Sequence, residues 1–568
     1  MDIQPTRTTL TKTEATSNSG MVATKDRHAT EAGIEVLELG GNAVDAAVAA
    51  CFAIGVVEPA SSGIGGGGYL VYQIKDRGGV IGFPMRGPIA AKPDMYELTG
   101  QPAGGIFGWA EVVGNENLEG PRSICTPGTV AGLCEAQRLH GRLPLADVMR
   151  PAIRLAGEGF PPGWYAVQAL GGQAGKLHRY DELRRIFMPD GDLPASGIEP
   201  GTMVQSDLAD TLETIAREGP NAFYKGEIGK AVVDGISEVG GILTRRDLES
   251  YRPYVWESGL EFSYRGHTVR VPPFACAGPT SAMTLRTVEG FDLASMGHNS
   301  TEMLHSYVSS TRLAYADRFA YMADPELHDV PWNGLVSDAY LSRRRASIGD
   351  RADRFDAGDP WVEEGRRPLR SLPASLSGWD YGTTHLCTMD GDGGAVSLTN
   401  TLGGGFGSGI VPKGTGVVVN NGMMWFDTIP GRTNSIEPGK LPLNNMTPAL
   451  VLDADGVLLA VGASGGRRIT NCVTQLIVKT LDFGMGPQEA IDSPRVDCSM
   501  PETYVDPRLD ETVRNELESL GHKLKVVDDG GLESGFPTFA SPVAILRDGT
   551  NGLRAGVDVF HSAYAGGP

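Results

Sequence analysis

A glycine followed by two threonines occupies residues 382–384, and a further threonine stands at 401. A threonine hydroxyl is a weak nucleophile until a base accepts its proton. A threonine that begins a chain carries a base on the same residue, because an α-amine has a pKa of about 8. Thr383 can gain this amine only if the chain is cut directly before it.

Gly382 is suited to such a cut. A glycine carbonyl is unhindered, and a glycine backbone tolerates the strained geometry of an N→O acyl shift. Attack of the Thr383 hydroxyl on the Gly382 carbonyl, followed by hydrolysis of the ester, would release the amine. We therefore predict self-cleavage into a large chain, 1–382, and a small chain, 383–568. The alternative is that these threonines only begin a β-strand, where threonine is common.

A predicted β-hairpin would position the hydroxyl. The turn sequence DGDGG at 390–394 lies between two runs of alternating residues. If the turn centres on Asp392, antiparallel pairing places Thr383 opposite Thr401. Directly opposed residues have Cβ atoms about 4.5–5.5 Å apart, so the two hydroxyls are expected to interact. A β-bulge would shift this pairing by one residue.

Two further segments carry groups that suit acyl chemistry. Gly465 and Gly466 follow a predicted strand and precede a predicted helix, so their N–H groups could form an oxyanion hole. A plain strand-to-helix turn is the alternative. Asn444 and Asn445 carry amides that can bind a carboxylate or a carbonyl, although asparagine is also a common loop residue.

The segment GIGGGG at 63–68 fits the GxGxxG pattern of dinucleotide-binding proteins. That motif requires a strand before the glycines and a helix after them. Here the predicted strand GYLVYQI (68–74) comes after the glycines, which argues against a dinucleotide site. The glycines then either form a flexible turn or line a pocket with their backbone amides.

Helices and short strands must hold these groups in place. Asn42 is expected to cap a buried, alanine-rich helix, and Asn299 with Glu302 has the form of a capping box. Beyond residue 383 the pattern changes to short strands with Gly, Asn and Asp turns, which favours a layered arrangement of helices and sheets. Hydrophobic periodicity and end signals predict helices at 29–39, 206–219, 299–322, 468–481 and 508–521.

The composition of the chain limits its expected partners, metal sites and location. The chain has 568 residues, a hydrophobic content of 41% and a net charge of −20. Such a charge argues against nucleic acid or an anionic membrane surface as the main partner. The cysteines form no close pairs and no Cys/His cluster with metal-ligand spacing, so no metal site is predicted. Because the opening residues lack the apolar core of a signal peptide, we expect a cytoplasmic protein.

Several motifs together resemble those of the γ-glutamyltranspeptidases, a family of N-terminal-nucleophile hydrolases. The match runs from Gly20 to the C-terminus, and the motifs stand in the order and spacing of that family. They are GGNAVDAAVAA, EPASSGIGGGGY, TPGTVAGL, TTHL, FGSGIV, VVVNNGM and GASGGRRI.

The resemblance implies a four-layer αββα sandwich of the α+β class, built by two intertwined chains from one precursor. It implies that Thr383 is the nucleophile, Thr401 its hydrogen-bonded helper, and Gly465 with Gly466 the oxyanion hole. Such a site acts through a hydroxyl, an amine and oriented N–H groups, so no cofactor is expected. The expected partners are a small-molecule substrate and the protein's own second chain. The two cleaved chains are expected to form a heterodimer.

The resemblance breaks down around the glutamyl group. Typical members bind its α-amino group with an asparagine two residues after the helper threonine, where this chain has Gly403. Further polar and acidic residues of that site correspond to Gly422 and Trp425. An unpaired buried charge costs on the order of several kcal/mol, so the missing anion would penalise a glutamyl ammonium.

The carboxylate end of the glutamyl site differs as well. The family arginine that binds the α-carboxylate aligns with Pro84, although Arg86 lies two residues away. The paired serines of the family correspond to Asn444 and Asn445. We therefore expect an intact catalytic apparatus and a rebuilt substrate pocket that prefers a non-glutamyl substrate.

Three alternatives remain open. The chain could cleave a C–C bond of a pyrrole-type intermediate, as similar proteins of lincosamide and pyrrolobenzodiazepine antibiotic biosynthesis do, because residues 423–426 offer an apolar surface. It could transfer γ-glutamyl groups or hydrolyse glutathione if Arg86 and Asp427 replace the missing residues. It could also be a binding protein without turnover, although Thr383, Thr401 and the glycine pair argue against this.

Overall fold

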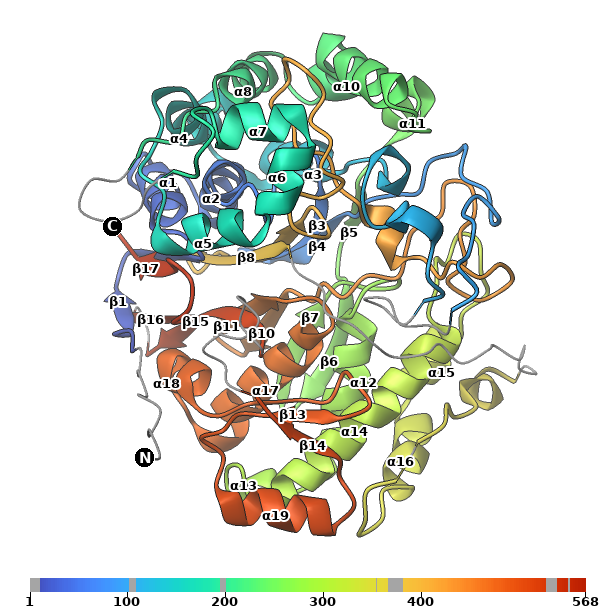
Figure 1. Ribbon diagram of the computed structural model, residues 1–568. Helices are drawn as coiled ribbons and strands as arrows, with labels where there is room; N and C mark the ends of the chain where they lie inside the picture. Colours follow the sequence, from blue (N-terminus) through green and yellow to red (C-terminus); the bar gives the residue numbers. More distant parts are fainter. Residues whose placement is uncertain are drawn as a thin grey trace, which may run out of the picture.

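Two seven-stranded sheets face each other, and helices cover the outer side of each sheet (Figure 1). This is the four-layer αββα arrangement of the α+β class that the sequence predicts. A third sheet has three short strands. The computed structural model describes residues 11–101, 109–194, 201–353, 355–365, 382–527, 539–549 and 552–568.

The sheet that carries Thr383 is antiparallel throughout. Thr383 opens one of its central strands and pairs with Thr401 of the neighbouring strand β9. In spatial order the strands are β17 (Tyr564–Gly566), β2 (Gly20–Thr24), β8 (Thr383–Asp390), β9 (Ala395–Thr401), β3 (Gly67–Ile74), β4 (Arg77–Phe83) and β5 (Tyr254–Trp256).

The facing sheet is also antiparallel. In spatial order its strands are β1 (Ala15–Ser17), β16 (Gly552–Val557), β15 (Ser541–Asp548), β11 (Gly456–Ser464), β10 (Ala449–Asp453), β7 (His267–Val271) and β6 (Leu260–Tyr264). The small sheet has the strands β12 (Val496–Asp497), β13 (Thr503–Val505) and β14 (Leu524–Val526).

The helices fall into two groups, one on each side of the paired sheets (Figure 1). On the side of the Thr383 sheet lie α1 (Arg27–Glu38), α2 (Ala43–Val57), α3 (Thr129–His140), α4 (Leu145–Glu158), α5 (Trp164–Gly172), α6 (Ala174–Arg179), α7 (Asp181–Phe187), α8 (Ser206–Glu218), α9 (Asn221–Tyr224), α10 (Glu227–Glu238) and α11 (Arg245–Ser250). On the other side lie α12 (Gly278–Val288), α13 (Leu293–Met296), α14 (Thr301–Tyr321), α15 (Trp332–Leu335), α16 (Asp338–Ala346), α17 (Arg468–Phe483), α18 (Pro487–Asp492) and α19 (Glu511–Ser519). Short 3₁₀ turns are η1 (Val113–Asn115), η2 (Pro121–Ser123), η3 (Pro360–Glu364) and η4 (Gly422–Trp425).

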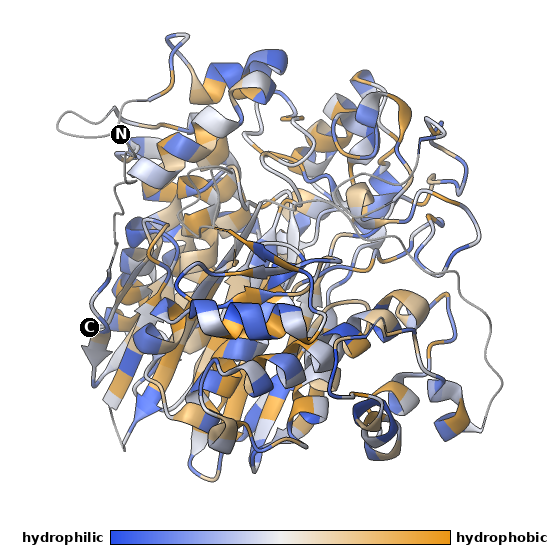
Figure 2. Cartoon of the chain, turned by 60° about the horizontal axis from the view of Figure 1, so that its bottom comes forward, coloured by the Kyte–Doolittle hydropathy of each residue, from blue (hydrophilic) through white to orange (hydrophobic). Residues whose placement is uncertain are grey.

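Apolar side chains fill three layers. One cluster packs the Thr383 sheet against its helices, a second lies between the two sheets, and a third packs the facing sheet against α12, α14 and α17. In Figure 2, hydrophobic residues recur along the strands and the helices. Every residue of α2 is buried, as expected for a helix that is apolar on all sides. No helix in the described part of the chain is both long and apolar enough to cross a membrane.

The structure confirms one of the two capping predictions. The Asn42 side chain accepts hydrogen bonds from the N–H groups of Val44 and Asp45, which begins α2 with a capping box. The prediction for α14 was wrong by one residue, because Ser300 is the cap. Asn299 instead has a positive φ of 57° and donates its side-chain amide to the carbonyl of Pro494.

The glycine-rich segment before β3 has a structural role that neither earlier interpretation included. A Cβ atom on Gly66 would lie 2.1 Å from the carbonyl oxygen of Thr401, and one on Gly65 would lie 2.2 Å from that of Val418. Glycine is required because other backbone segments approach this closely. The segment thereby supports the end of β9, where Gly67 pairs with Thr401.

Candidate active site

The hairpin pairing predicted from the turn sequence is confirmed. Thr383 lies opposite Thr401, and their hydroxyl oxygens are 3.0 Å apart. The Thr401 hydroxyl donates to the carbonyl oxygen of Gly382 at 2.5 Å. Because that hydrogen is used, the Thr383 hydroxyl is the donor in the threonine pair. Thr401 therefore contacts both the predicted nucleophile and the carbonyl of the bond that is predicted to be cut.

The backbone around this bond requires glycine. Gly382 has a φ of 120°, and a Cβ atom there would lie 2.6 Å from the carbonyl carbon of Gly404. The N–H of Gly403 donates to the Thr401 hydroxyl at 2.9 Å. The loop after β9 thus closes over Gly382 and holds its carbonyl beside the two threonines.

Gly465 and Gly466 lie where β11 ends and α17 begins. Both have positive φ values, 133° and 62°. Gly465 lines the same pocket as Thr383, and its carbonyl accepts a hydrogen bond from Nε of Arg468 at 3.0 Å. Glycine N–H groups beside a helix N-terminus suit a developing oxyanion, and the oxyanion-hole role of the pair stays a prediction.

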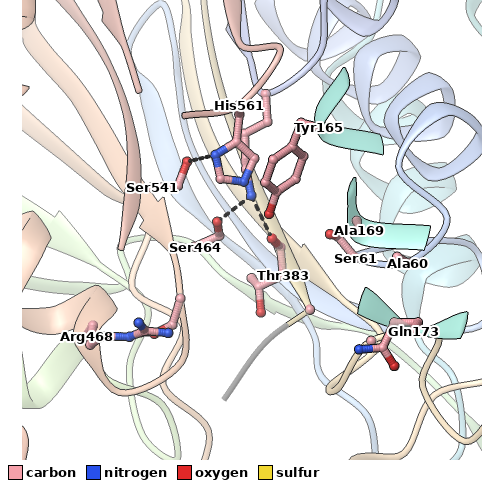
Figure 3. A pocket seen from close by; sticks show the side chains of 14 residues that line it. Ala60, Ser61, Tyr165, Ala169, Gln173, Thr383, Ser464, Arg468, Ser541 and His561 are labelled. Atoms are coloured by element: carbon pink, nitrogen blue, oxygen red, sulfur yellow. Dashed lines mark hydrogen bonds between the residues drawn. The ribbon is translucent and has the colours of Figure 1, made fainter. Parts of the chain in front are cut away.

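A pocket of about 480 Å³, counted with its opening to solvent, lies beside Thr383 (Figure 3). Residues of β11, β15 and the C-terminal segment form one wall, and residues of α5 form another. The lining residues are Lys25, Ala60, Ser61, Tyr165, Ala169, Gln173, Gly382, Thr383, Gly405, Ser464, Gly465, Arg468, Ser541 and His561.

Lys25 is a site residue that the sequence analysis missed. Its buried ammonium group donates to the backbone carbonyl of Thr383 at 3.2 Å and to the Ser464 hydroxyl at 2.6 Å. Burial lowers the pKa of Lys25, and the charge of Glu58 opposes this shift. The only sequence signal was a lysine directly after the apolar strand GMVAT.

His561 is a second residue that the sequence analysis missed. Its Nδ1 lies 2.7 Å from a carboxylate oxygen of Asp558 and 2.9 Å from the Ser541 hydroxyl, as Figure 3 shows for Ser541. The ring packs on Tyr165 with centroids 3.8 Å apart. Burial lowers the pKa of His561 to about 3, so the imidazole is neutral near pH 7. Although burial acts in the opposite direction, the hydrogen bond with His561 lowers the pKa of Asp558 to about 2.

The residues expected at the carboxylate end of the substrate are engaged elsewhere. Arg86 forms a 3.0 Å ion pair with Glu326. Asn444 donates its amide to the hydroxyl of Tyr69 and to the carbonyl of Ala275, and its amide oxygen accepts from the N–H of Met446.

The second asparagine contacts a buried cation. The amide oxygen of Asn445 accepts a hydrogen bond from the guanidinium of Arg318 at 3.1 Å. Burial lowers the pKa of Arg318 to about 10. None of Arg86, Asn444 and Asn445 lines the pocket beside Thr383 that the described residues form.

The positions expected at the α-amino end are filled by core packing. Trp425 is buried in the apolar cluster between the sheets, together with Met423, Met424 and Phe426. A Cβ atom on Gly422 would lie 3.0 Å from the thiol sulfur of Cys125. The apolar segment that suggested C–C bond cleavage therefore packs in the core.

Gly403 is the one position of this group beside the catalytic pair, and Asn421 fills the space around it. A Cβ atom on Gly403 would lie 2.2 Å from Oδ1 of Asn421. That oxygen accepts a hydrogen bond from the N–H of Gly404 at 2.7 Å, and the Asn421 amide donates to the carbonyl of Leu118.

Asp427 also has a partner. One of its carboxylate oxygens lies 3.0 Å from the guanidinium of Arg432, and the other accepts from the N–H of Ile429. Burial raises the pKa of Asp427, and the hydrogen bonds from Ile429 and Arg432 oppose this shift. In the described residues, no group of three His, Cys, Asp or Glu side chains has the geometry of a metal site.

Comparison with known proteins assigns the family. The family model of gamma-glutamyltranspeptidase matches residues 29–563. The chain is 36% identical to an acylase ACY 1 proenzyme of Pseudomonas sp. (strain V22), covering 91% of this chain and 89% of the relative. It is 34% identical to a glutathione hydrolase proenzyme of Bacillus subtilis (strain 168), covering 91% and 87%. A crystal structure of cephalosporin acylase from Bacillus halodurans superposes with a TM-score of 0.87 at 28% identity, covering 100% and 99%.

The chain belongs to the gamma-glutamyltranspeptidase family. It is an enzyme of the N-terminal-nucleophile hydrolase type, a class that transfers or hydrolyses acyl groups. Relatives with almost equal identity are named for two activities, acylase and glutathione hydrolase, so identity alone does not select the substrate.

Proposed function

We propose that this chain is a self-processing acylase whose acyl substrates lack an α-amino group. Cleavage between Gly382 and Thr383 yields the chains 1–382 and 383–568 and frees the Thr383 amine. The amine then accepts the hydroxyl proton while Oγ1 attacks the substrate carbonyl. The N–H groups of Gly465 and Gly466 stabilise the oxyanion, the amine leaving group departs with the proton, and water hydrolyses the resulting ester.

The main support for this proposal is the lack of space for a side chain at Gly403. The family asparagine for the glutamyl ammonium has no room at this position, because a Cβ atom would lie 2.2 Å from Oδ1 of Asn421. The acid that might replace it, Asp427, is paired with Arg432. An ammonium group bound here would be a buried charge without a partner, which is strongly unfavourable.

The opposite end of a glutamyl group meets a similar difficulty. Arg86 is the candidate for its α-carboxylate, and its guanidinium is already paired with Glu326 and lies 5.4 Å from the centre of the Tyr254 ring. Arg86 and Asp427 are both paired within the protein, so neither is free to bind a charge of an amino acid head group. This supports an acyl group other than γ-glutamyl.

Two anilides that differ only in the α-amino group test the proposal. We expect the processed enzyme to hydrolyse glutaryl-4-nitroanilide with a kcat/KM at least about tenfold above that of γ-glutamyl-4-nitroanilide, since one lost charge interaction corresponds to at least about that ratio. Thr383→Ala is the control and should abolish both activities. A preference for the γ-glutamyl compound that Thr383→Ala abolishes would overturn the proposal.

A further inference from the structure

The pocket beside Thr383 contains a buried ammonium group without a carboxylate partner. Lys25 is 2% exposed and donates to two neutral oxygens, the carbonyl of Thr383 and the hydroxyl of Ser464. In the part of the chain that the structure describes, no carboxylate lies within 4 Å of Lys25. A buried cation in such surroundings is costly unless an anion approaches it.

Two nearby acids compensate this charge only in part. Of the two acids, Glu58 raises the pKa of Lys25 more. Burial raises the pKa of Glu58 itself to about 7, so its carboxyl group is only partly ionised near neutral pH. Asp558 also acts on Lys25, but its carboxylate is bonded to His561. Neither acid lines the pocket.

The rest of the lining is suited to an anion. Arg468 lines the pocket as a second cation, and Ser61, Ser464 and Ser541 contribute hydroxyl groups. Among the described residues that line the pocket, there is no aspartate and no glutamate. Positive charge and hydroxyl donors that converge on one cavity are the groups that bind carboxylates.

The buried wall also contains a ring nitrogen that lacks a partner. Nε2 of His561 has no hydrogen-bond partner among the described residues, and the side chain is 2% exposed. Buried polar atoms in proteins are nearly always hydrogen-bonded. Because the ring is neutral and its Nδ1–H donates to the Asp558 carboxylate, Nε2 is an acceptor and calls for an N–H or O–H donor in the pocket, such as an amide N–H of the substrate or water.

We propose that this pocket binds a carboxylate group of the substrate, held mainly by the Lys25 ammonium. The inference rests on the proposed acylase function and adds the chemical class of the substrate. It differs from the glutamyl carboxylate site expected at Arg86, Asn444 and Asn445, since none of these residues lines the pocket. The carboxylate belongs either to the acyl part of the substrate or to its amine part.

A set of four anilides separates these two sources. The acyl group is glutaryl or valeryl, which differ by a terminal carboxylate. The amine is 4-nitroaniline or 3-carboxy-4-nitroaniline, which differ by a ring carboxylate. We expect one of the two carboxylates to raise kcat/KM about tenfold to a hundredfold, as charge-assisted hydrogen bonds do. Equal kcat/KM for all four compounds would overturn the inference.

Variants of Lys25 then test the residue. Lys25→Met should reduce the carboxylate preference to about twofold or less, because the cation is lost, while Lys25→Arg should retain part of it. Lys479→Met is the matched control, since Lys479 is equally buried and donates to backbone carbonyls of Ala490, Ser493 and Pro494 away from the site. It should keep the full preference. An unchanged preference in Lys25→Met would overturn the assignment.

The proposed function and this inference fail in different ways. If no anilide of the set is hydrolysed by the processed enzyme, the acylase proposal fails. If the anilides are hydrolysed and neither carboxylate changes kcat/KM, only the inference fails. The amount of cleaved chain is measured for every variant, and kcat/KM is calculated per processed enzyme. Poor processing of Lys25→Met therefore cannot be mistaken for a change in substrate preference.

Discussion

Thr383 and Thr401 meet across two neighbouring strands, whereas the residues expected around a glutamyl group come from separate loops and turns. In the hairpin, each hydroxyl contacts the other or the bond to be cut. In the second region, Arg86 and Asp427 are paired with Glu326 and Arg432. The predicted threonine pair is thus assembled, while the charged residues expected to bind a glutamyl head group are paired with protein groups.

In the proposed function, this difference separates the reaction from the choice of substrate. The threonine pair depends on the pairing of β8 with β9 within the central sheet. The expected glutamyl region depends on side chains at the ends of loops, and each can be replaced if its space is refilled. Beside Gly403, that space is occupied by Asn421.

The largest expected effect comes from removing the nucleophile. Thr383→Ala should leave one uncut chain of 568 residues and lower activity more than about 10³-fold, because both the acyl shift and catalysis require this hydroxyl. Intact mass under denaturing conditions measures the cut. Thr383→Ser retains a hydroxyl and should still be processed. Cleavage of Thr383→Ala at the same bond would contradict the role of Thr383.

The helper threonine should have a smaller effect. Thr401→Val removes the group that donates to the Gly382 carbonyl and should slow processing about 10²-fold, which is typical of one lost oxyanion or proton-transfer contact. The time course of chain cleavage after purification measures this rate. Thr399→Val is the matched control, because Thr399 lies two residues earlier on the same strand and bonds His385 instead. Equal slowing in both variants would indicate a general loss of stability.

Restoring the family asparagine tests the rebuilt region directly. Gly403→Asn should destabilise the fold by about 1–3 kcal/mol, because the position has a φ of 97° and Asn421 occupies the space. Gly439→Asn is the control, since its φ of 70° is similar and nothing lies within 4 Å of the new Cβ. Urea unfolding of the two variants gives the difference. A well-tolerated Gly403→Asn with raised γ-glutamyl turnover would show that the region was not closed to glutamate.

The smallest expected effect concerns the pH dependence of stability. It comes from His385, which lies two residues after Thr383. Burial lowers the pKa of His385 to about 3, so the unfolded chain takes up a proton first as the pH falls below 6.5. Stability should therefore be lost between about pH 6.5 and pH 3, by up to about 1.4 kcal/mol per pH unit for one proton. His385→Gln should reduce the loss between pH 7 and pH 5.5. Urea unfolding in a Thr383→Ala background keeps one chain, and an unchanged slope would contradict a buried neutral His385.

Several parts of the structure were predictable because they depend on neighbours in the chain. The turn at 390–394 determines the pairing of Thr383 with Thr401, since a hairpin has one partner for each residue. The cap at Asn42 likewise needs only the next three residues. The capping prediction at Asn299 was wrong because two adjacent polar residues compete for one position, and Ser300 has the required backbone conformation.

The roles of Gly65 and Gly66 could not be predicted locally. Their lack of side chains reflects the approach of Val418 and Thr401, which lie more than 300 residues later in the chain. The same holds for Lys25 and His561. No motif marks either residue, and their contacts with Ser464 and Asp558 are visible only in the folded chain.

The sequence by itself determined the family, the layered fold and the threonine pair, because each follows from motifs or from residues close together along the chain. Only the tertiary structure decided which polar groups remain available for a substrate. Burial and pairing are properties of the assembled layers, so they show that Arg86, Asp427 and Asn444 have protein partners, while Lys25 faces a pocket with no carboxylate of its own among the described residues.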